Sequence, residues 1–142
     1  MTASIDAELD VLAEEFELLG DWESQIQYVI DLGRNLAPLS EAERSEQNKV
    51  RGCASQVWLV TEESGGGRLA FRGDSDAHMV RGLIAILLQL YSGRTKAEIS
   101  AFDAKAALKR LGLDSMLSSQ RSNGLAAMVQ RIQRDAAAPA TA

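Results

Sequence analysis

Cys53 is the only cysteine in this sequence of 142 residues, and it lies in the stretch NKVRGCASQVW (residues 48–58), between a glycine and an alanine. A thiol reacts as its thiolate, which nearby cations and partial exposure favour. Lys49 and Arg51 are two such cations in the local sequence. A free cysteine is also among the residues most often buried in a protein core. The residues alone therefore leave two interpretations, a reactive loop thiol and an inert core thiol.

Three other features could carry chemistry. His78 could serve as the base of a cysteine hydrolase if it lay within hydrogen-bonding distance of Cys53, but near a helix start a solvated histidine is the simpler interpretation. Asp74 and Asp76 could form an acid–base pair, although carboxylates before an apolar run more often cap a helix. The glycines of SGGG (64–67) lack the Gly-Lys-Ser/Thr ending of a phosphate-binding loop and so indicate a turn.

The composition excludes several classes of function. One cysteine cannot form an internal disulfide, and one cysteine with one histidine provides too few ligands for a zinc site, so no metal is expected. The net charge of -5 and the lack of a basic stripe disfavour nucleic acid as a partner. No apolar stretch reaches the roughly 20 residues that span a bilayer. The acidic N-terminus does not resemble a signal peptide, so we expect a cytoplasmic protein without membrane contact.

Apolar residues at helical spacing, with capping residues before them, predict a series of helices. We expect a first helix at residues 5–19, with Gly20 as the stop, and a second after Asp21, which Gly33 would end near Arg34. A third should follow Asp74, Ser75 or Asp76 and extend to Tyr91. Further helices are expected at Thr95–Glu98, which have capping-box spacing, after Asp103 with Gly112 as the stop, and after Ser118 or Ser119, including Ile132.

A β-hairpin is predicted where SQVWLVTE (55–62) and RLAFRG (68–73) flank the glycine turn. The polar stretch APLSEAERSEQN (37–48) indicates a connection that leads to Cys53, and the alanine-rich tail (136–142) is expected to be frayed. Helices flanking a small antiparallel sheet of about three strands predict a single α+β domain over residues 1–142.

Three motifs in order resemble those of the SufE family of cysteine desulfuration proteins, with its CsdE relatives: NKVRGCASQVWLV, RGDSDAHMVRGLIAILLQLYSG and SSQRSNGLAAMVQRI. The likeness extends from Trp22 to about Arg134. It implies a SufE/IscU-like fold and a sulfur carrier rather than a self-contained enzyme. Such a protein accepts persulfide sulfur from a cysteine desulfurase of the SufS/CsdA type, stimulates that enzyme, and passes the sulfur towards an iron–sulfur scaffold. The pyridoxal phosphate belongs to the desulfurase, and no cofactor is expected on this chain.

The resemblance implies that Cys53 is the persulfide acceptor. A single cysteine is sufficient for thiol exchange, whereas cluster assembly would need several ligands. The resemblance further suggests supporting or interface roles for Arg51, Gly52, Ser55, Gln56, Asp76 and Arg121. Asp76 is expected near the cysteine loop, and Arg121 belongs to the RSxGL pattern. A partner-independent hydrolase that uses Cys53 and His78 and a non-catalytic adaptor remain the alternatives, and a homodimer stays open.

Overall fold

The computed structural model describes residues 4–53 and 55–137, and these form a three-stranded antiparallel sheet with seven helices. In chain order the elements are α1 (Ile5–Leu19), α2 (Trp22–Arg34), β1 (Val57–Glu63), β2 (Arg68–Ser75), α3 (His78–Tyr91), β3 (Arg94–Thr95), α4 (Lys96–Ala101), α5 (Ala104–Arg110), α6 (Leu113–Met116) and α7 (Ser119–Ala137). The expected α+β class is confirmed.

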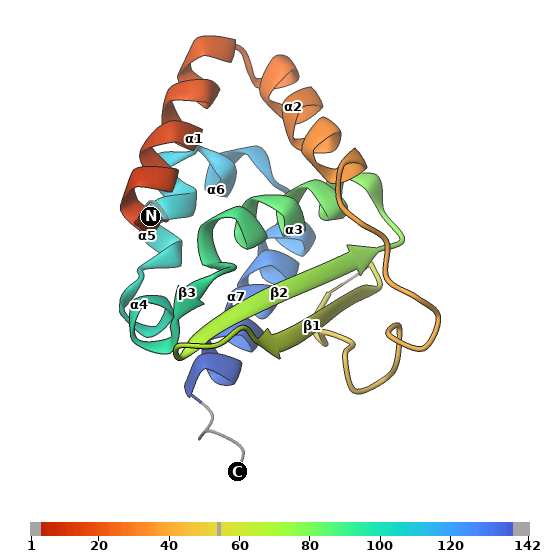
Figure 1. Cartoon of the computed structure of the whole chain (residues 1–142). Helices are drawn as coiled ribbons and strands as arrows, with labels where there is room; N and C mark the ends of the chain where they lie inside the picture. The colour runs from red at the N-terminus through yellow and green to blue at the C-terminus, as the bar shows by residue number, and fades with distance from the viewer. Residues whose placement is uncertain (1–3, 54, 138–142) are drawn as a thin grey trace.

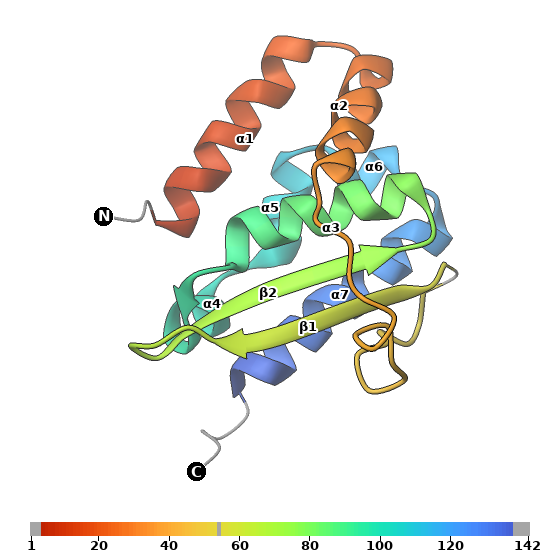
Figure 2. The same ribbon diagram turned by 45° about the vertical axis from the view of Figure 1, so that its right-hand side comes forward.

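The helices α1 and α2 form a hairpin above α3, and α3 in turn lies on the sheet, as Figures 1 and 2 show. Helix α3 is therefore covered on both sides, and its apolar residues form the centre of the core. Leu83, Leu87 and Leu90 are each 1% exposed. Helix α7 contacts α3 and α4 and completes the enclosure. No helix in the described part of the chain is both long and apolar enough to cross a membrane.

Two glycines allow α2 and α3 to cross in close contact. A Cβ added at Gly33 would lie 2.6 Å from the backbone nitrogen of Gly82, and one added at Gly82 would lie 2.1 Å from the carbonyl oxygen of Val29. Helix α2 ends at Arg34, as predicted, and Gly33 lies in its last turn. Gly33 is a packing residue, and only a residue without Cβ fits at this distance.

The predicted hairpin is confirmed. Strands β1 and β2 pair antiparallel from Val57 opposite Ser75 to Glu63 opposite Leu69. The three glycines of the turn, 65–67, all have positive φ, which a residue without Cβ adopts at no steric cost. Strand β3 adds a short third strand to β2.

Asp74 has a different role from the predicted helix cap. Its carboxylate is fully buried, and it accepts hydrogen bonds from the Leu39 amide (3.1 Å) and from Arg44 Nη2 (2.8 Å). Arg81 of α3 forms an ion pair with its other oxygen. The residue before α3 is Ala77, which makes no side-chain cap. Asp74 therefore fastens the connection of residues 35–56 to the sheet and to α3, and the cap prediction is wrong.

The later helix boundaries agree closely with the sequence. Thr95 and Glu98 form the expected capping box, and Asp103 accepts from the Ala106 amide at 3.1 Å. Ser118 Oγ accepts from the Arg121 amide at the start of α7. Helix α7 includes Ala136 and Ala137, so the prediction of a frayed tail is wrong for these two residues. Residues 138–142 lie outside the described part.

Candidate functional site

Cys53 lies on a short loop that is closed at its base by β-pairing. The Val50 amide donates to the Val57 carbonyl, the Leu59 amide donates to the Asn48 carbonyl, both at 2.8 Å, and Lys49 forms an isolated bridge with Trp58. Among the described residues, 51–53 and 55–56 are thereby left outside the ladder. Cys53 lies near the middle of this loop, three residues after Val50 and four before Val57.

The Cys53 side chain is half-buried against the first turns of α7. Its Sγ lies 3.5 Å from the Gly124 carbonyl oxygen. A Cβ on Gly124 would itself lie 3.5 Å from Sγ, so this glycine leaves the space beside the sulfur open. Gly52 has φ of 92° and faces Ala127. The cost of a glycine inside α7 is thus explained by the approach of the cysteine loop.

A cavity of about 260 Å³ adjoins the thiol. Val80, Leu83 and Met128 supply its apolar lining, while Ser55, Ser118, Gln120 and Arg121 supply the polar lining. Burial raises the pKa of Cys53 above its ordinary value, because a low-dielectric environment disfavours the thiolate. The cations expected to activate the thiol do not reverse this effect. Arg51 pairs with Glu46 at 3.0 Å, where both side chains are exposed.

The residues after Cys53 are held by the end of β2. Asp76 Oδ1 accepts from the Gln56 amide at 3.1 Å, and Ser75 Oγ donates to the Gln56 carbonyl at 2.6 Å. The Asp76 amide also donates to that carbonyl. We call these contacts of Gln56 with Ser75 and Asp76 the downstream anchor of the loop. Asp76 is therefore near the cysteine loop and holds its backbone.

The structure does not bring His78 to the thiol. His78 is exposed at the first residue of α3, and it is not among the residues that line the cavity beside Cys53. The hydrogen bond of the thiol goes to a backbone carbonyl instead. A cysteine nucleophile needs a base within hydrogen-bonding distance, so this geometry gives no support to a hydrolytic dyad.

Sequence reasoning missed Arg131, although it contacts the segment that leads to Cys53. Its guanidinium donates to the Lys49 carbonyl at 3.3 Å and to the Gln47 carbonyl at 3.0 Å. More than 80 residues separate the partners, so no local pattern could have indicated the contact.

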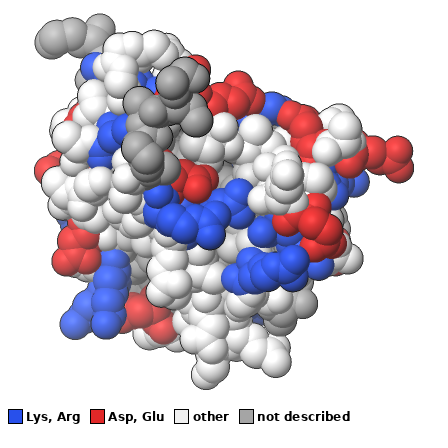
Figure 3. All heavy atoms as spheres, turned by 90° about the horizontal axis from the view of Figure 1, so that it is seen from below, with Lys and Arg blue, Asp and Glu red and all other residues white. Residues whose placement is uncertain are grey.

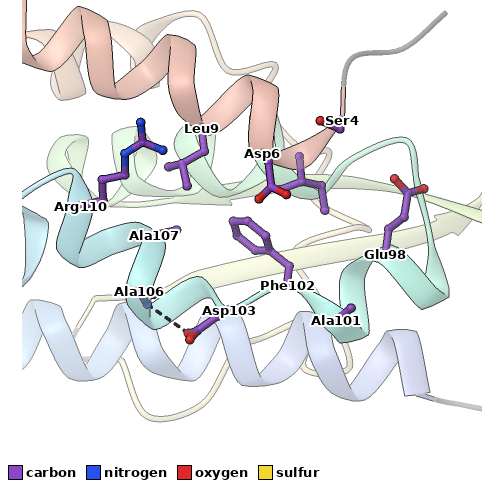
Figure 4. A pocket seen from close by; sticks show the side chains of 11 residues that line it. Ser4, Asp6, Leu9, Glu98, Ala101, Phe102, Asp103, Ala106, Ala107 and Arg110 are labelled. Carbon is purple, nitrogen blue, oxygen red and sulfur yellow. Dashed lines mark hydrogen bonds between the residues drawn. The ribbon is translucent and has the colours of Figure 1, made fainter.

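A larger cavity of about 540 Å³ lies between α1 and the α4–α5 region, as Figure 4 shows. Three of its charged side chains have structural partners: Asp103 caps α5, Glu98 completes the capping box of α4, and Arg110 pairs with Asp10. The residues that line it include neither cysteine nor histidine. Within residues 4–53 and 55–137, no group of three His, Cys, Asp or Glu side chains could hold a metal ion. The cavity beside Cys53 is therefore the stronger candidate.

Comparison with known proteins yields a consistent set of similarities. Residues 10–136 match the profile of the family described as "SufE: Fe-S metabolism associated domain". The chain is 52% identical over 139 residues to an uncharacterized SufE-like protein of Rhizobium etli, a match that covers 96% of this chain and 94% of the relative. A SufE-like protein of Rhizobium meliloti, also named as uncharacterized, is 48% identical over 131 residues, or 90% of this chain and 94% of the relative.

A solved structure has the same fold. The solution structure of a hypothetical protein from Thermus thermophilus superimposes with a TM-score of 0.74 over 91% of this chain and 93% of the other. The sequences are 18% identical, so this likeness concerns the fold alone.

Proposed function

Since the chain belongs to the SufE family, whose domain is associated with iron–sulfur metabolism, we propose that it is a sulfur carrier. Cys53 takes persulfide sulfur from a SufS/CsdA-type cysteine desulfurase, and the protein stimulates that enzyme and passes the sulfur to an iron–sulfur scaffold. The pyridoxal phosphate of the reaction belongs to the desulfurase. We place this activity in the cytoplasm.

The observation that carries this proposal is the placement of the only cysteine. Cys53 lies at the middle of a short loop, and its sulfur faces a cavity of about 260 Å³. A water molecule needs only about 15 Å³ of such volume, so one additional sulfur atom fits beside the thiol. Val80, Leu83 and Met128 would shelter that atom from reductant.

The transfer balances without an external oxidant. The Cys53 thiolate attacks the outer sulfur of the partner's persulfide, a new S–S bond forms on Cys53, and the S–S bond of the partner breaks. The partner's cysteine leaves with the electron pair as a thiolate, and solvent takes up the proton that Cys53 loses. The oxidation level of the transferred sulfur is unchanged, and no second cysteine is needed on this chain.

The loop would have two positions in this mechanism. In the buried position the raised pKa keeps the thiol protonated and therefore a poor nucleophile. In an outward position the thiol would regain its ordinary pKa and reach the desulfurase. Hydrogen exchange at residues 50–55 should then be faster than in β1 and should change when the desulfurase is added. Exchange as slow as in β1, and unaffected by the enzyme, would contradict a moving loop.

Intact mass tests the central claim. Wild type and Cys53→Ser are incubated with the desulfurase, pyridoxal phosphate and free cysteine, and their masses are recorded before any reductant is added. We expect a gain of about 32 Da, the mass of one sulfur atom, on wild type alone, and its reversal by thiol. No gain with any desulfurase of the same genome, on a folded protein with a reactive thiol, would refute the proposal.

Adding a His78→Ala variant to these two proteins separates the two alternatives. A hydrolase would cleave an ester or amide without a partner and would lose activity in His78→Ala. An adaptor would keep its function in Cys53→Ser. The sulfur carrier requires Cys53 and the desulfurase, and it tolerates the loss of His78.

A further inference from the structure

Arg131 of α7 binds the backbone just before the cysteine loop. Its Nη2 donates to the Gln47 carbonyl at 3.0 Å and its Nη1 to the Lys49 carbonyl at 3.3 Å. The carbonyls belong to alternate residues of one segment, and a planar guanidinium with several donors can reach both. The last of them is four residues before Cys53.

The guanidinium is itself held in place. Arg131 Nε donates to Asp135 Oδ2 at 3.3 Å, and the same oxygen accepts from Thr61 Oγ1 at 2.7 Å. Thr61 belongs to β1, so one carboxylate joins α7 to the sheet. The Arg131 and Asp135 side chains are 15% and 20% exposed, which limits the competition from water. We call Arg131, Asp135 and Thr61 the Arg131 clamp.

We infer that Arg131 is a positioning residue for Cys53. The Arg131 clamp binds the Gln47 and Lys49 carbonyls, and the Val50 amide is paired with β1. Residues 47–50 thus form the upstream anchor of the loop, as Ser75 and Asp76 form the downstream one. With both anchors fixed, Cys53 is tied to Val50 on one side and to Gln56 on the other. Cys53 can then lie no more than roughly 10 Å from the Val50 Cα, since three extended residues span about 3.5 Å each. The clamp thus confines sulfur transfer to a short, defined movement.

This role depends on the shape of the side chain as well as on its charge. A lysine at position 131 would keep the positive charge, but a single ammonium group does not reproduce the fixed fork of the guanidinium. Arg134 provides a matched control on the same helix. Its side chain is 73% exposed, and its Nε lies 3.9 Å from Asp135 Oδ1. Among the described residues, the side-chain hydrogen bonds to the Gln47 and Lys49 carbonyls come from Arg131 alone.

The experiment compares wild type with Arg131→Ala, Arg131→Lys and Arg134→Ala. The first readout is the rate of Cys53 alkylation by iodoacetamide in the free protein. The second is amide exchange at residues 47–52 and at Gln56. Both Arg131 variants should be alkylated faster, on the order of tenfold, because the lost charge-assisted hydrogen bonds held the buried position. Exchange should accelerate at 47–52 and not at Gln56, and Arg134→Ala should match wild type.

Stimulation of the desulfurase provides a third readout, which rests on the proposed function. A loosened anchor should raise the half-saturating concentration several-fold and leave the maximal rate nearly unchanged, because the loop must be ordered on binding. The first two readouts need no partner, so they test the clamp even if the chain accepts no sulfur.

The inference would be overturned if the Arg131 variants showed the same rates of Cys53 alkylation and of amide exchange as Arg134→Ala. Uniformly faster exchange throughout the chain would do so as well, since it would assign Arg131 to general stability. If Arg131→Ala does not fold, Cys53 alkylation and amide exchange in Arg131→Lys and Asp135→Asn test the inference instead.

Discussion

At the scale of single residues, the environment of Cys53 protects the sulfur more than it activates it. The thiol is half-buried and its pKa is raised by burial. Exposure of the thiol therefore controls its reactivity, and the pH dependence of that reactivity reports where the sulfur lies.

We predict that alkylation of Cys53 in the folded protein follows a pH profile with a midpoint above that of the urea-unfolded chain. The sign follows from burial, which favours the neutral thiol and postpones the formation of thiolate to higher pH. Initial rates with iodoacetamide across the alkaline range measure both midpoints. A folded-state midpoint below the unfolded one would show that nearby cations, such as Lys49 or Arg51, dominate over burial.

Gly124 contributes free space beside the sulfur. In Gly124→Ala the added methyl group would lie 3.5 Å from Sγ, an ordinary contact, so the thiol form should fold normally. Helix propensity should stabilise the variant by up to about 1 kcal/mol. The narrowed cavity should nevertheless shorten the lifetime of a Cys53 persulfide in added thiol severalfold, as intact mass over time would measure.

Asn123→Ala is the matched control for this variant. Asn123 is the exposed neighbour of Gly124 on α7, so its replacement improves helix propensity and leaves the cavity unchanged. A persulfide that survives as long in Gly124→Ala as in Asn123→Ala would mean that the extra sulfur does not occupy the cavity beside Gly124.

At the scale of the elements, the loop is defined by what holds its two ends. The end of β2 holds Gln56, and α7 holds residues 47–49 through Arg131. A third contact lies farther upstream, where the buried carboxylate of Asp74 binds Arg44 and the Leu39 amide. The connection of residues 35–56 therefore depends on ion pairs and backbone hydrogen bonds to the folded core.

Asp74 should make the stability of the fold depend on pH in the acidic range. Burial raises its pKa, but the hydrogen bonds from Arg44 and from the Leu39 and Ser75 amides outweigh burial, and the net pKa is below the ordinary value. A lowered folded-state pKa stabilises the fold above the unfolded pKa of about 3.9. That stability is lost as the pH falls through the folded-state pKa.

Asp74→Asn should therefore cost about 3 kcal/mol of unfolding free energy at pH 7, because two arginines lose a buried partner. The difference from wild type should shrink as the pH falls below about 4. Urea unfolding at pH 7, 5, 4 and 3 measures the difference in unfolding free energy. Asp114→Asn, which changes an exposed aspartate, is the control. A difference that stays constant from pH 7 down to pH 3 would show that Asp74 has the same pKa in the folded and unfolded states, which would contradict the lowered pKa.

These elements also show which features a sequence can predict. The caps at Asp21, Thr95 and Asp103 act within three residues, so local patterns found them. Asp74 looked like another cap because its partners at Leu39 and Arg44 are 30 or more residues away. The cavity beside Cys53 depends on Gly124, which is 71 residues away. The candidate thiol was readable from the sequence, and the contacts that hold it were not.

At the scale of the whole molecule, charge is distributed unevenly. Residues 1–33 contain nine of the 20 Asp and Glu residues and none of the 15 Lys and Arg residues. The hairpin α1–α2 is consequently acidic. Near the cysteine loop, the lining of a cavity of about 410 Å³ includes four basic residues, Lys49, Arg51, Arg131 and Arg134, and one acidic residue, Glu46. Figure 3 views the molecule from below and shows Lys and Arg side chains gathered on that face, with carboxylates between them.

Under the proposed function, this asymmetry should turn Cys53 towards a desulfurase that presents an acidic surface. Exposed charges at the rim of an interface act mainly on the association rate, and salt screens them beyond about 10 Å at 0.1 M. Arg51→Glu and Arg121→Glu should each slow association severalfold at low salt, and the effect should shrink at high salt. Glu17→Arg, a reversal on the exposed face of α1, should change the rate little. Stopped-flow association with the desulfurase at both salt concentrations measures all three variants. An effect of Glu17→Arg as large as that of Arg51→Glu would place the interface on the hairpin, because a rim charge acts only where the partner arrives.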